Sequence, residues 1–229
     1  MTINAEFIAS FLYSVIRITT PLLFGAMGAL ICKQGGVLHI AFEACMLFAA
    51  FFGMAASAFT QSLWVGLLAG MAGGVLLMLA LGYFTYKLDA NITLTGIALN
   101  TLASGGTVFL MYLMCGEKGA STSLPSLVFP NIDIPLIKDI PLVGQVLSGH
   151  NILTYVAFIM PIFIYILIFK TPLGLRIRTV GENENAAASV GINVNRTKYI
   201  TLAIGGAVTS LGGIFTVSYT HLRAHETVL

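Results

Sequence analysis

The sequence is poor in charged side chains, and this scarcity excludes a water-soluble protein. Only 9% of the 229 residues are Asp, Glu, Lys or Arg, whereas soluble domains carry about 25%. Hydrophobic residues make up 57% of the chain, and the mean hydropathy is +0.93. A core built from this chain could not hide so much apolar surface from water. We therefore expect the lipid bilayer to be its solvent.

Motifs for catalysis and ligand binding are also missing. The sequence contains no phosphate-binding loop, no GxSxG nucleophile elbow and no HExxH zinc motif. Cys32, Cys45 and Cys115 follow no metal-ligand or disulfide spacing, so we expect small packing residues there. The net charge of +2 is too small to indicate nucleic-acid binding. The chain is therefore predicted to be no enzyme and to bind no cofactor or metal. Any energy from ATP would come from a separate subunit.

Six continuous apolar runs are long enough to be transmembrane helices. Each approaches the ~20 residues that a spanning helix needs, whereas a transmembrane barrel would need short alternating strands. The sequence therefore predicts an all-α integral membrane protein, a multi-span helical bundle with its transmembrane domain over residues 1–218. The expected spans are Phe7–Ile31, Leu38–Ala58, Leu63–Tyr86, Ile92–Cys115, Ile152–Phe169 and Tyr199–Ser218.

Two features of these runs concern helix packing. Pro21 follows Arg17 within the first run, which is therefore either a kinked span or an interfacial piece followed by a short span. Small residues recur every four positions in two other runs, which predicts close helix contacts within the chain or between subunits. They are Gly66, Gly70 and Gly74 in the third run, and Gly205, Thr209 and Gly213 in the sixth.

The basic residues predict the orientation in the membrane. The connection 170–198 holds five of the eleven Lys and Arg residues, so the positive-inside rule places it in the cytoplasm. Alternation then puts the turns that carry Lys33 and Lys87 inside, and the N-terminus and the outer connection 116–151 outside. That outer connection has apolar side chains between spaced prolines, so we expect it to cover the outer mouth of the bundle, with a loosely ordered loop as the alternative.

The 170–198 connection carries local helix signals. Thr171-Pro172 ends the fifth span, and Asn183 and Asn185 are candidate N-caps for a short helix over 186–190. Gly191 suits the C-terminal stop of that helix. The helix either lies in the lipid headgroups or docks into a groove on a soluble partner. A surface of small residues favours the partner: Ala186, Ala187, Ala188 and Gly191.

A few polar side chains within or beside the spans are the candidate path residues. His39 and Glu43 are four residues apart, so they would share one helix face. An ionisable group at mid-bilayer costs about 3 kcal/mol and is retained where it faces protein or a water-filled path. The pair is either part of a gate or a packing contact near the interface. Asn91 and Asn100 either bond a neighbouring helix or contact a polar solute.

The last eleven residues, 219–229, break the pattern abruptly. They look like a translated sequencing adaptor joined to an interrupted reading frame. We therefore expect a non-native tail and a natural chain that continues past about residue 218. His221 and His225 have the i, i+4 spacing that can bind a metal on a helix, but we favour the adaptor interpretation.

Three stretches of the sequence carry a resemblance to a known family. They are TPLLFGAMG at 20–28 with GGVLHIAFE at 35–43, the start of the fourth span at 91–100, and TPLGLRIRTVGEN at 171–183 with Ala186, Ala187 and GINV at 191–194. They resemble membrane permeases of ATP-binding-cassette importers, in the branch that includes ribose and branched-chain amino acid permeases. The similarity covers nearly all of Phe7–Ser218. His39 and Ala44 depart from the pattern, since the family usually has Asn and Gly there.

The resemblance implies a permease subunit of an importer in the bacterial plasma membrane, nearest to nucleoside and simple-sugar permeases that work with lipoprotein binding proteins. The implied partners are a cytosolic ATPase, a second and non-identical permease subunit, and the binding lipoprotein outside. The expected solute is a nucleoside, with a simple sugar as the alternative. Family chains continue for several more spans. The residues implied in ATPase coupling are Arg176, Arg178, Gly181, Glu182, Asn183, Ala186, Ala187 and Gly191, and those in the path are His39, Glu43, Asn91 and Asn100.

Two other classes of protein remain open. A secondary transporter could use Glu43 and His39 as proton-coupling groups. A membrane enzyme could use the same pair, but the sequence offers no nucleophile or metal-ligand set to accompany it.

Overall fold

The computed structural model describes residues 5–115, 130–132, 146 and 148–226, which are almost entirely helical. Six helices of the described part are long and apolar enough to cross a membrane, so the predicted multi-span bundle is confirmed. They are α1 (Ala5–Gln34), α2 (Phe42–Thr60), α3 (Leu63–Lys87), α4 (Ile92–Cys115), α7 (Ile152–Lys170) and α10 (Val194–Glu226). Two short helices, α8 (Pro172–Glu182) and α9 (Glu184–Ser189), and two short strands, β1 (Asn131–Ile132) and β2 (His150–Asn151), complete these elements.

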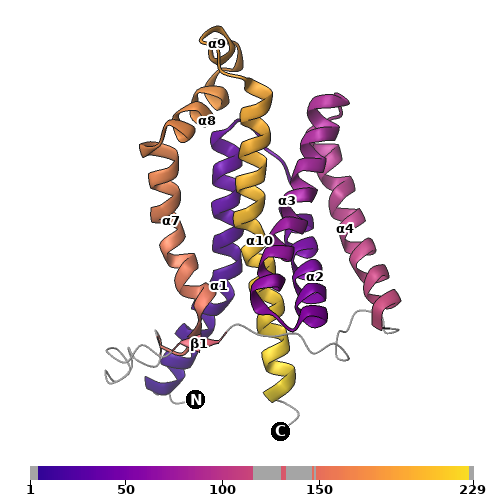
Figure 1. The fold of residues 1–229 in the computed structure, drawn as a ribbon. Coiled ribbons are helices and arrows are strands. Elements are labelled where there is room, and N and C mark those ends of the chain that lie inside the picture. Colours follow the sequence, from indigo (N-terminus) through magenta and orange to yellow (C-terminus); the bar gives the residue numbers. More distant parts are fainter. Residues whose placement is uncertain (1–4, 116–129, 133–145, 147, 227–229) are drawn as a thin grey trace.

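Helix α10 runs through the centre of the bundle (Figure 1). It packs against α1, α2 and α3, while α7 flanks α1 on one side and α4 flanks α2 and α3 on the other. Helices α8 and α9 lie together at one end of the bundle, and the antiparallel pair β1–β2 lies at the opposite end. In the described part of the chain, short helices therefore lie at one end of the bundle and paired strands at the other.

The predicted stripes of small residues lie at contacts within this chain. A side chain at Gly74 would overlap Ser210 on α10 and lie 2.9 Å from the Cys45 sulfur on α2. At Gly70 it would lie 2.8 Å from the carbonyl oxygen of Ala49. Because these glycines let the backbones approach so closely, α2, α3 and α10 pack as one block.

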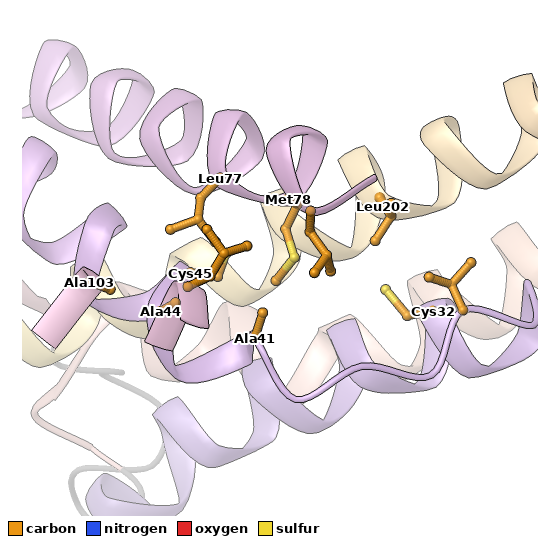
Figure 2. Packing of buried hydrophobic residues seen from close by; sticks show 11 residues of the cluster. Cys32, Ala41, Ala44, Cys45, Leu77, Met78, Ala103 and Leu202 are labelled. Carbon is orange, nitrogen blue, oxygen red and sulfur yellow. The ribbon is translucent and has the colours of Figure 1, made fainter. Parts of the chain in front are cut away.

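A cluster of buried apolar side chains fills this block (Figure 2). Met78 of α3 lies near Leu202 of α10, and both are fully buried. Cys32 and Cys45 are buried free thiols, which agrees with the expectation of small packing residues.

Three expectations about the chain's course have different outcomes. Helix α1 is continuous past Pro21, so an interfacial piece followed by a short span is wrong. The outer connection lies outside the described residues except at 130–132, 146 and 148–151, so its covering role stays a prediction. The backbone of α10 continues to Glu226. The side chains of His221 and His225 lie outside the described part, and the non-native tail also stays a prediction.

Candidate functional site

The chain is not helical between α1 and α2, and this break extends into the bundle. The segment 35–41 leaves α1, and α2 begins only at Phe42. In the first turns of α2, the Cys45 thiol donates to the Gly206 carbonyl of α10, 3.4 Å away. Gly206 lies about 18 Å along α10 from the start of that helix. Non-helical backbone at such a depth occurs only where protein or a water-filled cavity surrounds it.

Asn100 of α4 holds the start of α2. Its side-chain oxygen accepts a hydrogen bond from the Ala44 backbone N–H at 3.0 Å, and its side-chain nitrogen donates to the Ile40 carbonyl at 3.1 Å. Ala41, the residue at the N-cap position of α2, makes no side-chain hydrogen bond to the helix. Asn100 therefore takes the place of an N-cap residue, and its predicted bond to a neighbouring helix is present.

His39 and Glu43 do not share a helix face, so that expectation is wrong. His39 precedes α2 and is 8% exposed, whereas Glu43 lies in the first helical turn and is exposed. The ring of His39 packs against Phe42 with 4.1 Å between ring centres and a tilt of 31°, and its Nδ1 accepts from the Ala41 N–H at 3.3 Å. The other ring nitrogen, Nε2, is buried and without a hydrogen-bond partner in the described structure. His39 thus presents a free polar group within the break.

Asn91 has a local role. Its side-chain oxygen accepts from the backbone N–H groups of Thr93 at 2.9 Å and Leu94 at 3.2 Å, which caps the N-terminus of α4. The side chain is exposed and lies at the end of the helix rather than at the break. Of the four predicted path residues, the structure therefore brings His39 and Asn100 to the break directly and places Glu43 beside it.

A single threonine separates α7 from α8. Thr171 accepts from the Gly174 N–H at 3.1 Å and so caps α8, with Pro172 at the first helical position. Asn183 caps α9 by accepting from Ala186 N–H at 3.0 Å, as predicted. Gly191, at φ +82°, donates to the Ala188 carbonyl and ends that helix. The second candidate cap, Asn185, instead lies inside α9.

Two residues expected on the docking surface are packed inside the chain. Ala187 is fully buried, while Ala186, Ala188 and Gly191 are exposed. A side chain at Gly181 would collide with the carbonyl of Gln34 at the end of α1. The expectation of a docking surface that includes Ala187 is therefore wrong, because this side of α9 faces the protein.

An open groove of about 1110 Å³ lies between α8, the loop after α9 and the start of α10. Arg176 and Arg196 line it together with apolar side chains, of which Leu175 is 63% and Val190 is 72% exposed. Arg178 does not line the groove, and its guanidinium lies 4.8 Å from the ring centre of Phe169. Glu182 and Asn183 are exposed at the junction of α8 and α9.

At the opposite end, α1 is attached to strand β2, a contact that the sequence did not predict. The ring of Tyr13 stacks on His150 at 4.1 Å, and its hydroxyl donates to the Gly149 carbonyl at 3.0 Å. His150 Nε2–H donates to the Val146 carbonyl at 2.8 Å. Burial lowers the pKa of His150 below its ordinary value, and the charge of Arg17 adds to this, although the bond to Val146 opposes it.

Comparison with known proteins gives the family of this membrane-spanning bundle. A model of the branched-chain amino acid transport system / permease component family matches residues 11–228. The chain therefore belongs to this family of transporter permeases. No solved structure is similar enough to count as a match.

Three curated relatives match most of the chain. The guanosine ABC transporter permease protein of Bacillus subtilis is 36% identical over 84% of this chain and 62% of its own length. A putative glucose ABC transporter permease protein of Haloferax volcanii is 29% identical, with 91% and 62% covered. A nucleoside ABC transporter permease protein of Lactococcus lactis is 28% identical, with 85% and 63% covered. The chain thus spans less than two thirds of the length of these relatives.

Proposed function

We propose that this chain is the permease subunit of an ATP-driven importer that carries a nucleoside. Two of the three relatives described above are named for guanosine or nucleoside transport, which supports that solute class. Relatives named for glucose and L-arabinose transport make a simple sugar the second candidate. The chain binds no ATP in this proposal, and a separate ATPase subunit supplies the energy.

The observation that carries the proposal is the groove at the α8–α9 end. It offers two arginines beside exposed apolar side chains, a combination that is enriched at protein interfaces. The arginines favour a partner with acidic side chains around an apolar contact. We assign this face to the cytosolic ATPase, with Arg176, Gly191 and Ala186 in contact with it. Arg178, Gly181 and Ala187 position α8 and α9 from behind.

The break before α2 is the proposed translocation path. Helix α2 starts inside the bundle, so the positive end of its dipole points into the protein rather than into water. Transporters use such discontinuous helices around solute sites near the bilayer midplane. Because His39 Nδ1 accepts from the Ala41 N–H, the neutral ring carries its proton on Nε2, which offers a free hydrogen-bond donor to a polar solute there. Helices around this path would reorient when the ATPase closes.

The same proposal gives the assembly and its orientation. The α8–α9 end lies in the cytoplasm of a bacterial cell, and the N-terminus and the outer connection 116–151 lie outside the plasma membrane. A substrate-binding lipoprotein delivers the solute to that outer face. The second permease subunit is non-identical, which is supported by two differently named nucleoside permeases of Lactococcus lactis that both match this chain.

Uptake into vesicles tests the function. The chain is co-expressed and purified with its ATPase and second permease, reconstituted into liposomes, and supplied with binding lipoprotein and radiolabelled guanosine. We expect uptake only with ATP on the ATPase side, and competition by unlabelled guanosine but not by ribose or glucose. Uptake driven by a proton gradient without ATP would instead support a secondary transporter, and competition by the sugars would move the solute to that class.

A further inference from the structure

A buried lysine joins helix α9 to the spans. Lys198 lies near the start of α10 and is only 8% exposed. Its ammonium group pairs with the carboxylate of Glu184, the first residue of α9. The Glu184 side chain is 52% exposed, so the pair is buried at the lysine and open at the carboxylate. A lysine is seldom buried unless its charge is compensated.

The same ammonium group also lies over an aromatic ring of a third helix. It is 4.8 Å from the ring centre of Tyr86, in the last turn of α3. The ring of Tyr86 in turn meets the ring of Tyr199 edge-on, with 6.0 Å between centres. Lys198 therefore contacts α9 and α3 at once while belonging to α10. Cation–π contacts are stronger when they are desolvated, as this one is.

Below this contact, α3 and α10 pack closely against each other. A side chain at Gly82 would lie 2.8 Å from Leu202 and 2.9 Å from Tyr199. Further along, Gly74 packs on Ser210 and on Cys45, in the first turns of α2. A displacement of the α3–α10 pair at its α9 end is therefore passed by direct contact to the start of α2, where the break lies.

We infer that Lys198 is a positioning residue that transmits the movement of α9 to α3 and α10, through its ion pair with Glu184 and its contact with Tyr86. This inference rests on the proposed function, since it needs an ATPase that moves α9. Without the ammonium group, α9 would stay attached through α8 and the backbone, but its movement would be transmitted less efficiently.

The test measures guanosine imported per ATP hydrolysed in the reconstituted complex. Lys198→Met keeps the apolar stem and removes the charge. We expect it to lower import per ATP about tenfold, within the range of substitutions that alter coupling between sites. ATP hydrolysis and ATPase co-purification stay near wild type. The separate variant Lys198→Arg, which keeps the charge, should retain most of the wild-type import per ATP.

Lys87→Met is the matched control. Lys87 also lies over a tyrosine ring, with its ammonium 5.6 Å from the centre of Tyr83, but it is exposed whereas Lys198 is buried. We expect its import per ATP to equal that of the wild type. If the Lys198→Met chain does not accumulate in the membrane, Tyr86→Leu decides, because it removes the ring contact and leaves both charges in place.

The outcomes separate this inference from the proposed function. A wild-type complex without ATP-dependent import would overturn the function and the inference with it. An active wild type with unchanged import per ATP in Lys198→Met, or in Tyr86→Leu where that variant decides, would overturn the inference alone. Loss of ATPase co-purification in Lys198→Met would also overturn it, because Lys198 would then belong to the docking contact.

Discussion

At the scale of single residues, one amide decides where a transmembrane helix begins. Asn100 satisfies the Ala44 N–H in a partly buried bond and the Ile40 carbonyl in an exposed one. Within a membrane span, lipid offers no hydrogen bond that could replace the amide at these backbone groups. Ala44 is 56 positions away from Asn100 in the sequence. Its function is thus positional, since it stabilises the break that includes His39.

We predict that Asn100→Leu destabilises the protein by about 1–3 kcal/mol, because it leaves two backbone groups without partners. Thermal unfolding of the purified chain in detergent, followed by circular dichroism, measures this. Thr101→Ala is the control. The Thr101 hydroxyl is exposed and bonds only to the Ile97 carbonyl of its own helix, so this change should alter stability by less than about 0.5 kcal/mol. Equal stabilities of the two variants would contradict the capping role.

At the scale of elements, α8 and α9 have one face in the protein and one face in solvent. Gly174, Ile177 and Val180 are the buried residues of α8, and Ala187 is the buried residue of α9. The remaining surface of α9 is exposed, including Ala186 and Ala188. A substitution that tests docking must therefore be made on the exposed side, because a change at Ala187 or Gly181 would disturb the chain's own packing.

We predict that Ala188→Glu reduces co-purification of the ATPase at least tenfold, since it adds bulk and an unpaired charge to a close interface. Insertion in the membrane should not change, because Ala188 is exposed. Thr93→Glu is the control, an exposed residue in the first turn of α4, where a carboxylate is favourable to the helix dipole. Undiminished ATPase recovery with Ala188→Glu would argue against the docking face.

At the scale of the whole molecule, the orientation can be measured directly. In a background without Cys32, Cys45 and Cys115, a cysteine at exposed Val190 should react with a membrane-impermeant maleimide only after the membrane is opened. A cysteine at exposed Thr60, at the end of α2, should react in intact cells. The reverse pattern would place the α8–α9 end outside and remove the basis for ATPase docking.

Local patterns predicted much of this fold because their physical causes are local. The span Ile92–Cys115 has the predicted bounds, since hydropathy and the cap at Asn91 act within a few residues. Asn183 begins α9 and Gly191 ends it for the same reason. The sequence predicts that the second span starts at Leu38, whereas α2 starts at Phe42. The run is apolar on both sides of the break, and the residue that caps α2 lies on α4.

The sequence alone determined that this chain is a helical membrane bundle and where its connections lie, because burial of apolar segments in lipid depends on composition and length. It also placed the short helix α9, because capping depends on neighbouring residues. Only the tertiary structure decided that Ala187 faces inward, that Asn100 caps α2, and that Lys198 joins α9 to Tyr86. Those outcomes depend on which helices are neighbours, and contacts between distant segments have no signature in a local stretch of sequence.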